Sequence, residues 1–594
     1  GYDVITLNNA FKDPTFMREP LAYRIMRDFM PAPRANWVVL RINGENWGVY
    51  VNVQKADKSL LDEWFPSQDG NRYKALPHQA DLVWKGQEAS AYQQSYELKS
   101  DEGPESWVDL VDMIDVLNNT SGMGLLQQLD ARIAVDRTLW HLAAQNLLLN
   151  LDSYVQTANN YYLYHDTFHD RMSLIPWDLN EAFGCFTNGL SIPQLQTLDP
   201  LYKSEVNNRP LFTKLVDLGP TRDRYFAHYR TIRDRWFDWS ILGPWIQTYQ
   251  DLIRDEVYAD TKKLYTSELF EKGVTEDISL GGGPGPGPGA QIPGLQPLVE
   301  ERTAFLLAHP EVSKASPTID AVGISPLEPV DGEPVFVTVA STPPAGQSIW
   351  FVRLHWRVQG AFDHTDMFDD GQHGDGQPDD GVWGLEIPGY PAGSRVEFFF
   401  ESTTPPGPGG PALVCEPLAA EHAPHSYVVL SDNVDLPLRL NEFMADNEAS
   451  SSDEAGEFDD WLEILNTSDA DLDLGGLHLT DDLTNSSKWT IPGGVVAPAH
   501  GTVLFWADED QEQGATHTNF KLGAGGEEIG LFASDGLSAI DTIVFGSQAA
   551  DISTGRLFDG DALWVTLLDP TPGASNEAAA GTARRYSALD PASH

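Results

Sequence analysis

Residues 149–166, LNLDSYVQTANNYYLYHD, carry the pattern on which the interpretation of the chain depends. Asp152 follows an apolar segment, Asn159 and Asn160 form an amide pair, and an aromatic run comes next. Further on, a second acid, Asp178, follows the residues SLIPW. The pattern predicts a buried helix, a loop with an acid, a pair of amides, a β-hairpin, and an acid where that hairpin ends.

These residue types are the ones that phosphoryl transfer from a nucleotide requires. One carboxylate positions the attacking hydroxyl. A second carboxylate and an amide oxygen hold Mg2+, a hard ion that takes few protein ligands beside phosphate oxygens. The alternative is structural, because an Asp after a helix often caps a turn and Asn-Asn is a common turn pair. Spacing alone favours the turn, so both interpretations stay open at this point.

The composition describes a large, acidic chain of several domains. Its 594 residues include 88 Asp and Glu against 38 Lys and Arg, which gives a formal net charge of −50. A chain of this length favours roughly three or four domains. Its acidic surface repels phosphate backbones and anionic lipid, so binding to nucleic acid or to a membrane surface is disfavoured, whereas binding of divalent cations is compatible.

Cysteine content and hydropathy argue against a disulfide-rich protein, a cysteine zinc protein and a membrane-spanning protein. Only Cys185 and Cys415 occur, so a disulfide framework or a cysteine zinc site is excluded. No apolar run is long enough to predict a transmembrane segment. The chain opens at GYDVITLNNAF, which is typical of the middle of a domain, so the missing signal peptide leaves export open.

Hydrophobic spacing predicts an α+β domain before about residue 315. Helices are expected at 107–117, 136–150, 222–237 and 296–310. The segment 35–53, ANWVVLRINGENWGVYVNV, predicts a β-hairpin that turns at Asn-Gly. The segment GGGPGPGPGA at 281–290 predicts a flexible insertion before the last helix.

After this point short alternating strands and Gly, Pro and Asp turns dominate. They predict two all-β sandwiches, at 316–430 and 436–577. The tail 578–594 is expected to be disordered.

Several motifs resemble those of the spore-coat CotH kinase family. They are FKDPTFMREPLAYRIMRDF, ANWVVLRINGENWGVYVNV, LDSYVQTANNYYLY and IPWDLNEAFG, and the resemblance covers about 1–313. It implies a divergent kinase-like fold and a secreted bacterial enzyme that uses ATP and Mg2+ to phosphorylate Ser or Thr of exported or coat proteins. The family's early strands, with RG…S and PK, are expected to precede these residues.

The resemblance also assigns roles to single residues. Asp152 would be the catalytic acid that positions the hydroxyl, and Asp178 the principal Mg2+ ligand. Asn159 or Asn160 would bind the metal or a phosphate. Lys74, in RYKA, would contact phosphate.

Four further positions bear on nucleotide binding and on activity. The resemblance implies that Tyr73 and Trp177 sandwich adenine, since aromatic faces stack on bases. Many members have Asp where Asn180 stands and Glu where Gln54 stands. The alternative function is therefore an inactive extracellular adhesin or scaffold with a kinase-like domain.

The segment 367–384, MFDDGQHGDGQPDDGVWG, repeats Asp-Gly at Asp370, Asp375 and Asp380. Closely spaced carboxylates and glycines let a backbone wrap a hard cation such as Ca2+. The alternative is a solvated turn between two strands, and it is slightly favoured.

The last unit resembles a lamin-tail domain, an immunoglobulin-like sandwich. Motifs such as RLNEFMADN, DDWLEILN and PTPGASN carry the resemblance over about 437–577. It implies attachment to a cell-surface or coat partner and no chemistry. Glu442, Asp459 and Asp460 invite a metal interpretation, but hydrogen bonding at strand starts is favoured, and His517 is expected to serve packing or a turn.

Overall fold

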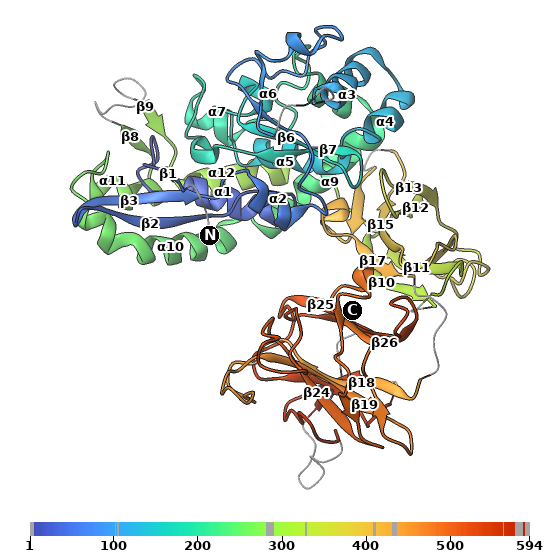
Figure 1. Cartoon of the computed structure of the whole chain (residues 1–594). Coiled ribbons are helices and arrows are strands. Elements are labelled where there is room, and N and C mark those ends of the chain that lie inside the picture. The colour runs from blue at the N-terminus through green and yellow to red at the C-terminus, as the bar shows by residue number, and fades with distance from the viewer. Residues whose placement is uncertain are drawn as a thin grey trace. The chain divides into compact units, whose positions relative to one another are not determined.

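A computed structural model gives the fold of the chain (Figure 1). It describes residues 5–100, 103, 106–280, 290–326, 329–407, 411–429, 436–561, 564–576 and 586–588. Two compact units form, and each is described by itself. The first contains the chain up to Ile319 together with Ser341–Met367 and Phe398–His425, and the second contains the remainder.

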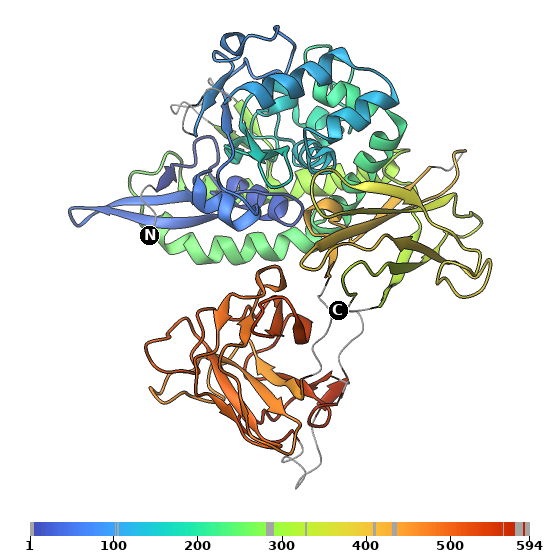
Figure 2. The same cartoon turned by 45° about the vertical axis from the view of Figure 1, so that its right-hand side comes forward.

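Small antiparallel sheets form the strand part of the first unit. The predicted hairpin is confirmed, and Asn43 and Gly44 turn it with φ of 52° and 81°, as a two-residue Asn-Gly turn requires. Figures 1 and 2 show this hairpin lying along the long helix α10 (Trp239–Ala259). The strands in sheet order are β1 (Thr6–Asn8), β3 (Glu45–Val53) and β2 (Ala35–Ile42); β5 (Tyr96–Leu98), β4 (Arg72–Ala75), β6 (Tyr161–Asp166) and β7 (Arg171–Pro176); and β8 (Ile278–Leu280) and β9 (Ala290–Ile292).

Helices make up most of the rest of the first unit, and the four predicted ones are present. The predicted helix 136–150 forms as α5 but ends at Leu147. The helices are α1 (Arg18–Arg27), α2 (Lys58–Trp64), α3 (Val108–Asn119), α4 (Met123–Asp130), α5 (Val135–Leu147), α6 (Tyr154–Thr157), α7 (Ile192–Gln196), α8 (Pro210–Asp217), α9 (Gly219–Arg235), α10, α11 (Ser267–Thr275) and α12 (Leu295–Ala308). Across the described ranges, no helix combines the length and the apolar character needed to cross a membrane.

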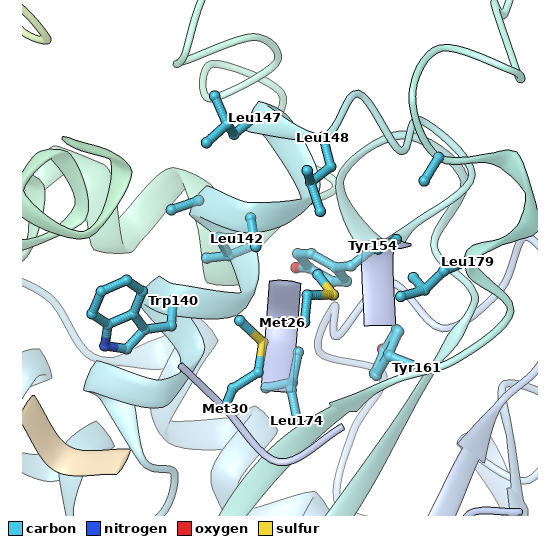
Figure 3. Packing of buried hydrophobic residues seen from close by; sticks show 14 of the residues in the cluster. Met26, Met30, Trp140, Leu142, Leu147, Leu148, Tyr154, Tyr161, Leu174 and Leu179 are labelled. Atoms are coloured by element: carbon cyan, nitrogen blue, oxygen red, sulfur yellow. The ribbon is translucent and has the colours of Figure 1, made fainter. Parts of the chain in front are cut away.

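The main core of this unit lies where α1, α5 and β7 meet (Figure 3). Met26 of α1, Trp140 of α5 and Leu174 of β7 are all buried there. The flexible insertion predicted at 281–290 falls almost entirely outside the described residues.

Residues 318–428 form two sheets, and the predicted strands are present. One sheet has the order β10-β11-β14 and the other β13-β12-β15-β16, with β17 beside β15. The first sheet lies mostly in the second unit and the other mostly in the first, so one sandwich at 316–430 stays a prediction. The strands are β10 (Thr318–Ser325), β11 (Val335–Thr342), β12 (Phe351–Arg357), β13 (Asp363–Asp366), β14 (Val382–Ile387), β15 (Arg395–Thr403), β16 (Leu413–Glu416) and β17 (His425–Val428).

Antiparallel sheets also form the rest of the second unit around an apolar core. The predicted disordered tail lies outside the described residues except for β29, which pairs with β28. The strands in sheet order are β24 (Thr502–Ala507), β19 (Asp460–Asn466), β18 (Leu438–Met444), β27 (Ser553–Arg556), β28 (Trp564–Leu567) and β29 (Tyr586–Ala588); β22 (Trp489–Thr490), β21 (His478–Thr480), β25 (Gly526–Phe532) and β26 (Ala539–Gly546); and β20 (Leu472–Asp473) and β23 (Val496–Ala497).

Two glutamates face each other between β18 and β19. Glu442 pairs with Glu463 in the strand register, and both side chains are buried. Burial raises the pKa of Glu463 to about 8, and the neighbouring Glu442 carboxylate adds to the rise. Asn441 Nδ2 and the Gly573 N–H donate hydrogen bonds to Glu463 at 2.9 and 3.0 Å. These bonds favour the ionised form but do not offset the burial.

This raised pKa predicts that the second unit loses stability as the pH rises. The folded state keeps the Glu463 proton up to about pH 8, whereas the unfolded chain releases it near its ordinary pKa of 4.5. Glu463 therefore stabilises the fold at low pH, and this contribution is lost as the pH rises from about 4.5 to 8. Glu463→Gln, which mimics the protonated acid, should remove most of this pH-dependent loss in urea unfolding, a loss on the order of 5 kcal/mol between pH 4.5 and 8. The exposed Glu448→Gln is the control, and equal slopes for wild type and Glu463→Gln would contradict the assignment.

Candidate functional site

The polar residues that the sequence singled out lie in loops anchored by buried neighbours. Tyr154, Tyr161 and Leu179 follow closely after Asp152, Asn160 and Asp178 in the sequence. Figure 3 shows these three anchors in the main core, where each is almost fully buried. Because the anchors fix the backbone, the polar side chains next to them are held in place.

Asp152 lies in the loop between α5 and α6, and Asn160 holds it. Asn160 Nδ2 donates to Asp152 Oδ2 at 3.0 Å and to the Asp152 carbonyl oxygen at 2.8 Å. Ala158 and Asn160 have φ of 55° and 60°, so the chain reverses tightly enough for this contact. Asn160 therefore orients the Asp152 carboxylate.

Asn159 has a different environment from its neighbour. Its side chain is buried, and within the described ranges its Oδ1 has no hydrogen-bond donor. A buried acceptor without a donor costs about 1–3 kcal/mol, so such an oxygen is suited to a cation or to a donor on a ligand.

Asp178 follows β7 and begins the short turn Leu179–Glu181 with φ of 54°. Burial raises its pKa, the Asp152 carboxylate raises it further, and the Lys74 ammonium opposes the rise. Lys74 projects from β4, and its Nζ lies 5.9 Å from the centre of the Trp177 ring. The structure thus gathers Asp152, Asp178, Lys74 and Trp177 from separate segments of the chain.

Glu181 and Lys12 belong to the same group, and neither was predicted. Lys12 Nζ donates to Glu181 Oε1 at 2.5 Å, and both side chains are largely buried. Burial raises the pKa of Glu181, Lys12 opposes the rise, and the carboxylates of Asp152 and Asp178 add to it. The group therefore holds three acids and two lysines.

Glu19 of α1 approaches the group from another side. It is 3% exposed, and Asn8 Nδ2 donates to its carboxylate oxygens at 3.0 and 2.9 Å. Burial raises its pKa to about 8, and the charge of Asp178 contributes. Glu19 thus extends the acidic group into the core beneath it.

Tyr73 lies apart from this group. Its ring is fully buried and packs 5.4 Å from that of Trp107, and its hydroxyl donates to the Ser106 carbonyl oxygen. Successive residues of a strand point to opposite faces, so Tyr73 and Lys74 face apart. Trp177 instead packs edge-on against Tyr162, at 5.5 Å. The predicted Tyr73–Trp177 sandwich is therefore not formed.

Gln54 belongs to a separate cluster. Its Oε1 accepts the Arg34 backbone N–H at 3.0 Å, and its Nε2 lies 3.4 Å from Glu63 Oε2. Arg27 and Arg34 pair with Glu63. An acid at position 54 would thus face this arginine cluster.

The 367–384 loop is closed by its own backbone. Asp375 is fully buried and accepts hydrogen bonds from the N–H groups of Asp370, Gly371 and His373 at 2.6, 2.8 and 2.8 Å. Asp370, His373 and Asp375 each have one oxygen or nitrogen that could bind a metal ion, and these three atoms lie within 4.8 Å of one another. Asp380 does not belong to this set. The backbone donors give the Asp375 carboxylate the partners that a cation would otherwise supply, which favours the turn interpretation.

Replacement of Asp375 distinguishes a turn from a calcium site. Asp375→Asn puts an amide nitrogen where an oxygen accepts backbone N–H groups, so we expect a loss of about 1–3 kcal/mol in urea unfolding. The loss should be equal in calcium and in chelator. The exposed Asp379→Asn in the same loop should change little, and a larger loss with calcium present would establish the cation site instead.

Two regions of the chain match known protein families. Residues 1–279 match the family described as CotH kinase protein, and residues 435–547 match the Lamin Tail Domain. The chain therefore carries an N-terminal domain of the CotH kinase protein family and a lamin tail domain, which confirms both resemblances. Inner spore coat protein H of Bacillus subtilis (strain 168) is 24% identical over 277 residues, which cover 46% of this chain and 74% of that protein.

Solved structures give weaker likenesses. A cycloalternan-forming enzyme from Listeria monocytogenes with a pentasaccharide substrate is 11% identical, with a TM-score of 0.15, over 40% of this chain and 21% of that one. An uncharacterized Listeria monocytogenes protein with glucose, magnesium and calcium is 10% identical, with the same coverage and TM-score. The chain spans about a fifth of the length of these structures, and the likeness carries no argument.

Proposed function

We propose that the N-terminal domain is an atypical protein kinase that transfers phosphate from ATP to Ser or Thr of a protein. The observation that carries the proposal is that Asp152, Asp178 and Lys74 lie close together. The Asp152 carboxylate raises the pKa of Asp178, and the Lys74 ammonium lowers it. Two acids and a lysine in one partly buried place are the groups that phosphoryl transfer uses. Membership of residues 1–279 in the CotH kinase protein family supports it.

The residues present fit a magnesium ion. Asp178 is an acid whose ionisation is opposed by burial and by Asp152, and a bound cation would relieve both. Asn159 offers a buried oxygen that has no donor within the described part of the chain. Asp178 and Asn159 would hold the ion, which neutralises charge on the transferring phosphate when it is bound with ATP.

The remaining residues would position the reactants. Asp152, held by Asn160 at Oδ2, would accept the proton of the attacking hydroxyl at its other carboxylate oxygen, Oδ1. Lys74 would bind a phosphate oxygen. The exposed part of Trp177, next to Lys74, would contact the adenine.

One curated relative supports a proposal for the phosphate acceptor and for the compartment. One relative is an inner spore coat protein, which supports a coat or surface location and an exported protein as the phosphate acceptor. The lamin tail domain would attach the enzyme to that structure. The net negative charge of the whole chain favours a basic or neutral partner over a nucleic acid.

The second candidate is an inactive surface scaffold. Asn180 and Gln54 favour it, because the family resemblance implies acids at these two positions. Lys12 also bonds to Glu181, so one cation of the group is already neutralised. In this alternative the fold would keep its acids only for hydrogen bonding.

Thermal unfolding with nucleotide separates the two candidates. A ligand at about 100 times its dissociation constant stabilises the folded state by about 2.7 kcal/mol. We expect ATP with Mg2+ to raise the unfolding temperature, and ATP with EDTA to raise it less. No shift with Mg2+ and ATP, together with no labelled phosphate on a mixed acceptor, would favour the scaffold.

A further inference from the structure

A second acidic loop, in the lamin tail domain, differs from the 367–384 loop in its hydrogen bonds. It precedes β19 and contains Asp453, Glu457 and Asp459. One carboxylate oxygen of each of the three lies within 4.8 Å of the others. None of these acids has a role in the proposed kinase site.

Asp453 is the buried member of the cluster, at 8% exposed. Its Oδ1 accepts the Glu457 N–H at 2.7 Å, which shapes the loop. Its Oδ2 is buried and, within the described residues, has no donor. A carboxylate oxygen of this kind is costly to bury, so its position beside two further acids calls for a positive partner.

A neighbouring amide points to the same conclusion. Gln513 Nε2 donates to Glu457 Oε2 at 2.8 Å. Gln513 Oε1 is also buried without a donor in the part of the chain that the structure describes. Gln513 Nε2 also donates to Asp510 Oδ2 at 2.9 Å, so the amide is held beside the cluster by its nitrogen while its oxygen is left as a second buried acceptor.

The charges around the cluster are mostly negative. Burial raises the pKa of Asp459, and the carboxylates of Asp508, Asp453 and Glu457 raise it further, opposed by Lys521. No lysine or arginine among the described residues forms an ion pair with Asp453, Glu457 or Asp459. The nearby His517 is engaged with Asp508 and Glu454, so it offers no nitrogen.

We propose that Asp453, Glu457 and Asp459, with the Gln513 amide oxygen, bind a divalent cation of the calcium class. All four donors are hard oxygens, and no sulfur or nitrogen takes part. Ca2+ lies about 2.3–2.6 Å from its ligands, so oxygens that share one ion are at most about 5 Å apart, and one oxygen from each of the three carboxylates meets this limit. A cation here joins the loop to the first residues of β19.

The two acidic loops differ in the hydrogen bonds of their buried aspartates, Asp375 and Asp453. The 367–384 loop has three Asp-Gly pairs and the 453–459 loop has one glycine, but both hold three acidic or imidazole groups within 4.8 Å of one another. The oxygens of Asp375 accept three backbone N–H groups, whereas Asp453 Oδ2 accepts none within the described ranges. Backbone N–H donors around the Asp375 carboxylate indicate a closed turn, whereas their absence at Asp453 Oδ2, among the residues that the structure describes, indicates a cation site.

Asp453→Asn tests the site with little risk to the fold. Asparagine keeps the Oδ1 that accepts the Glu457 N–H and replaces the unpartnered Oδ2 with an NH2 group, which can donate to Glu457 or Asp459. After chelator treatment the variant should therefore unfold at a temperature equal to or above that of wild type. Asp459→Asn is the second variant, and the exposed Glu448→Gln is the matched control from the preceding loop.

The measurement is calcium binding and calcium-dependent melting of the full chain without nucleotide. We expect wild type and Glu448→Gln to bind one more calcium ion per chain than Asp453→Asn or Asp459→Asn. We also expect calcium to raise the unfolding temperature of the first two proteins more than that of the last two. Magnesium should give a smaller rise. Equal calcium stoichiometry in all four proteins, or an equal calcium shift in Asp453→Asn and wild type, would overturn the proposal.

Discussion

Asp178→Asn should reduce phosphate transfer by at least about 10³-fold, because a metal ligand at a transferring phosphate contributes several kcal/mol of charge stabilisation. The variant should fold, since Asn is among the residues that best tolerate the left-handed backbone that Asp178 adopts at φ 54°. Loss of this charge also removes its repulsion with Asp152, which raises the pKa of Asp178 in the wild type. A loss of activity is therefore not explained by unfolding.

The measurement is transfer of labelled phosphate from ATP to a mixed protein acceptor. Asp170→Asn is the matched control, because Asp170 has a φ of 52° and its side chain is 88% exposed. The control should keep full activity. Transfer that continues at the wild-type rate in Asp178→Asn would remove Asp178 from the site, even if the chain is a kinase.

Glu421→Gln should be the most destabilising single change of a charged residue in the first unit. Glu421 lies in the turn η3 (Ala420–His422), and its Oε1 accepts from Arg171 at 2.5 Å and from Arg357 at 3.3 Å. All three side chains are about 3% exposed. Removal of a buried charge that pairs with buried partners costs about 3–5 kcal/mol. Here the buried arginines lose a carboxylate that offsets the cost of burying them, and Arg171 keeps Asp130.

The pH dependence of Glu421 gives the same interaction a second signature. Burial alone would raise its pKa, but Arg171, Arg357 and Arg137 lower it to about 2. The stabilisation is therefore present above the ordinary pKa of 4.5 and is lost as the pH falls toward 2. Urea unfolding at pH 7 and pH 3 should show the wild type losing more stability than Glu421→Gln. The exposed Glu301→Gln should follow the wild type, and a cost below about 1 kcal/mol for Glu421→Gln would contradict the assignment.

Local patterns predicted much of the fold. Asn43-Gly44 predicted the β2–β3 turn, and the aromatic run after Asn160 predicted the β6–β7 hairpin with Asp178 at its end. These features depend on neighbouring residues, so spacing is enough to find them. The period of a strand could also have separated Tyr73 from Lys74, since adjacent residues point to opposite faces.

Other parts of the site depend on distant contacts. Lys12 and Glu181 are 169 positions apart, and no periodicity links them. The difference between Asp375 and Asp453 likewise depends on which backbone N–H groups face each carboxylate. Both loops are acidic in sequence, and sequence does not show which backbone N–H groups face their carboxylates.

The division of the chain has a practical consequence for anyone who wants to produce the catalytic region alone. The first unit takes Ser341–Met367 and Phe398–His425 from beyond the predicted domain end at 313. A fragment that stops at 313 would lose Glu421 and Glu401, the carboxylates that neutralise Arg171 and Arg224. A fragment that is to keep these carboxylates must therefore extend to about His425, because one that ends at 313 would leave Arg171 with Asp130 and Arg224 with Asp136.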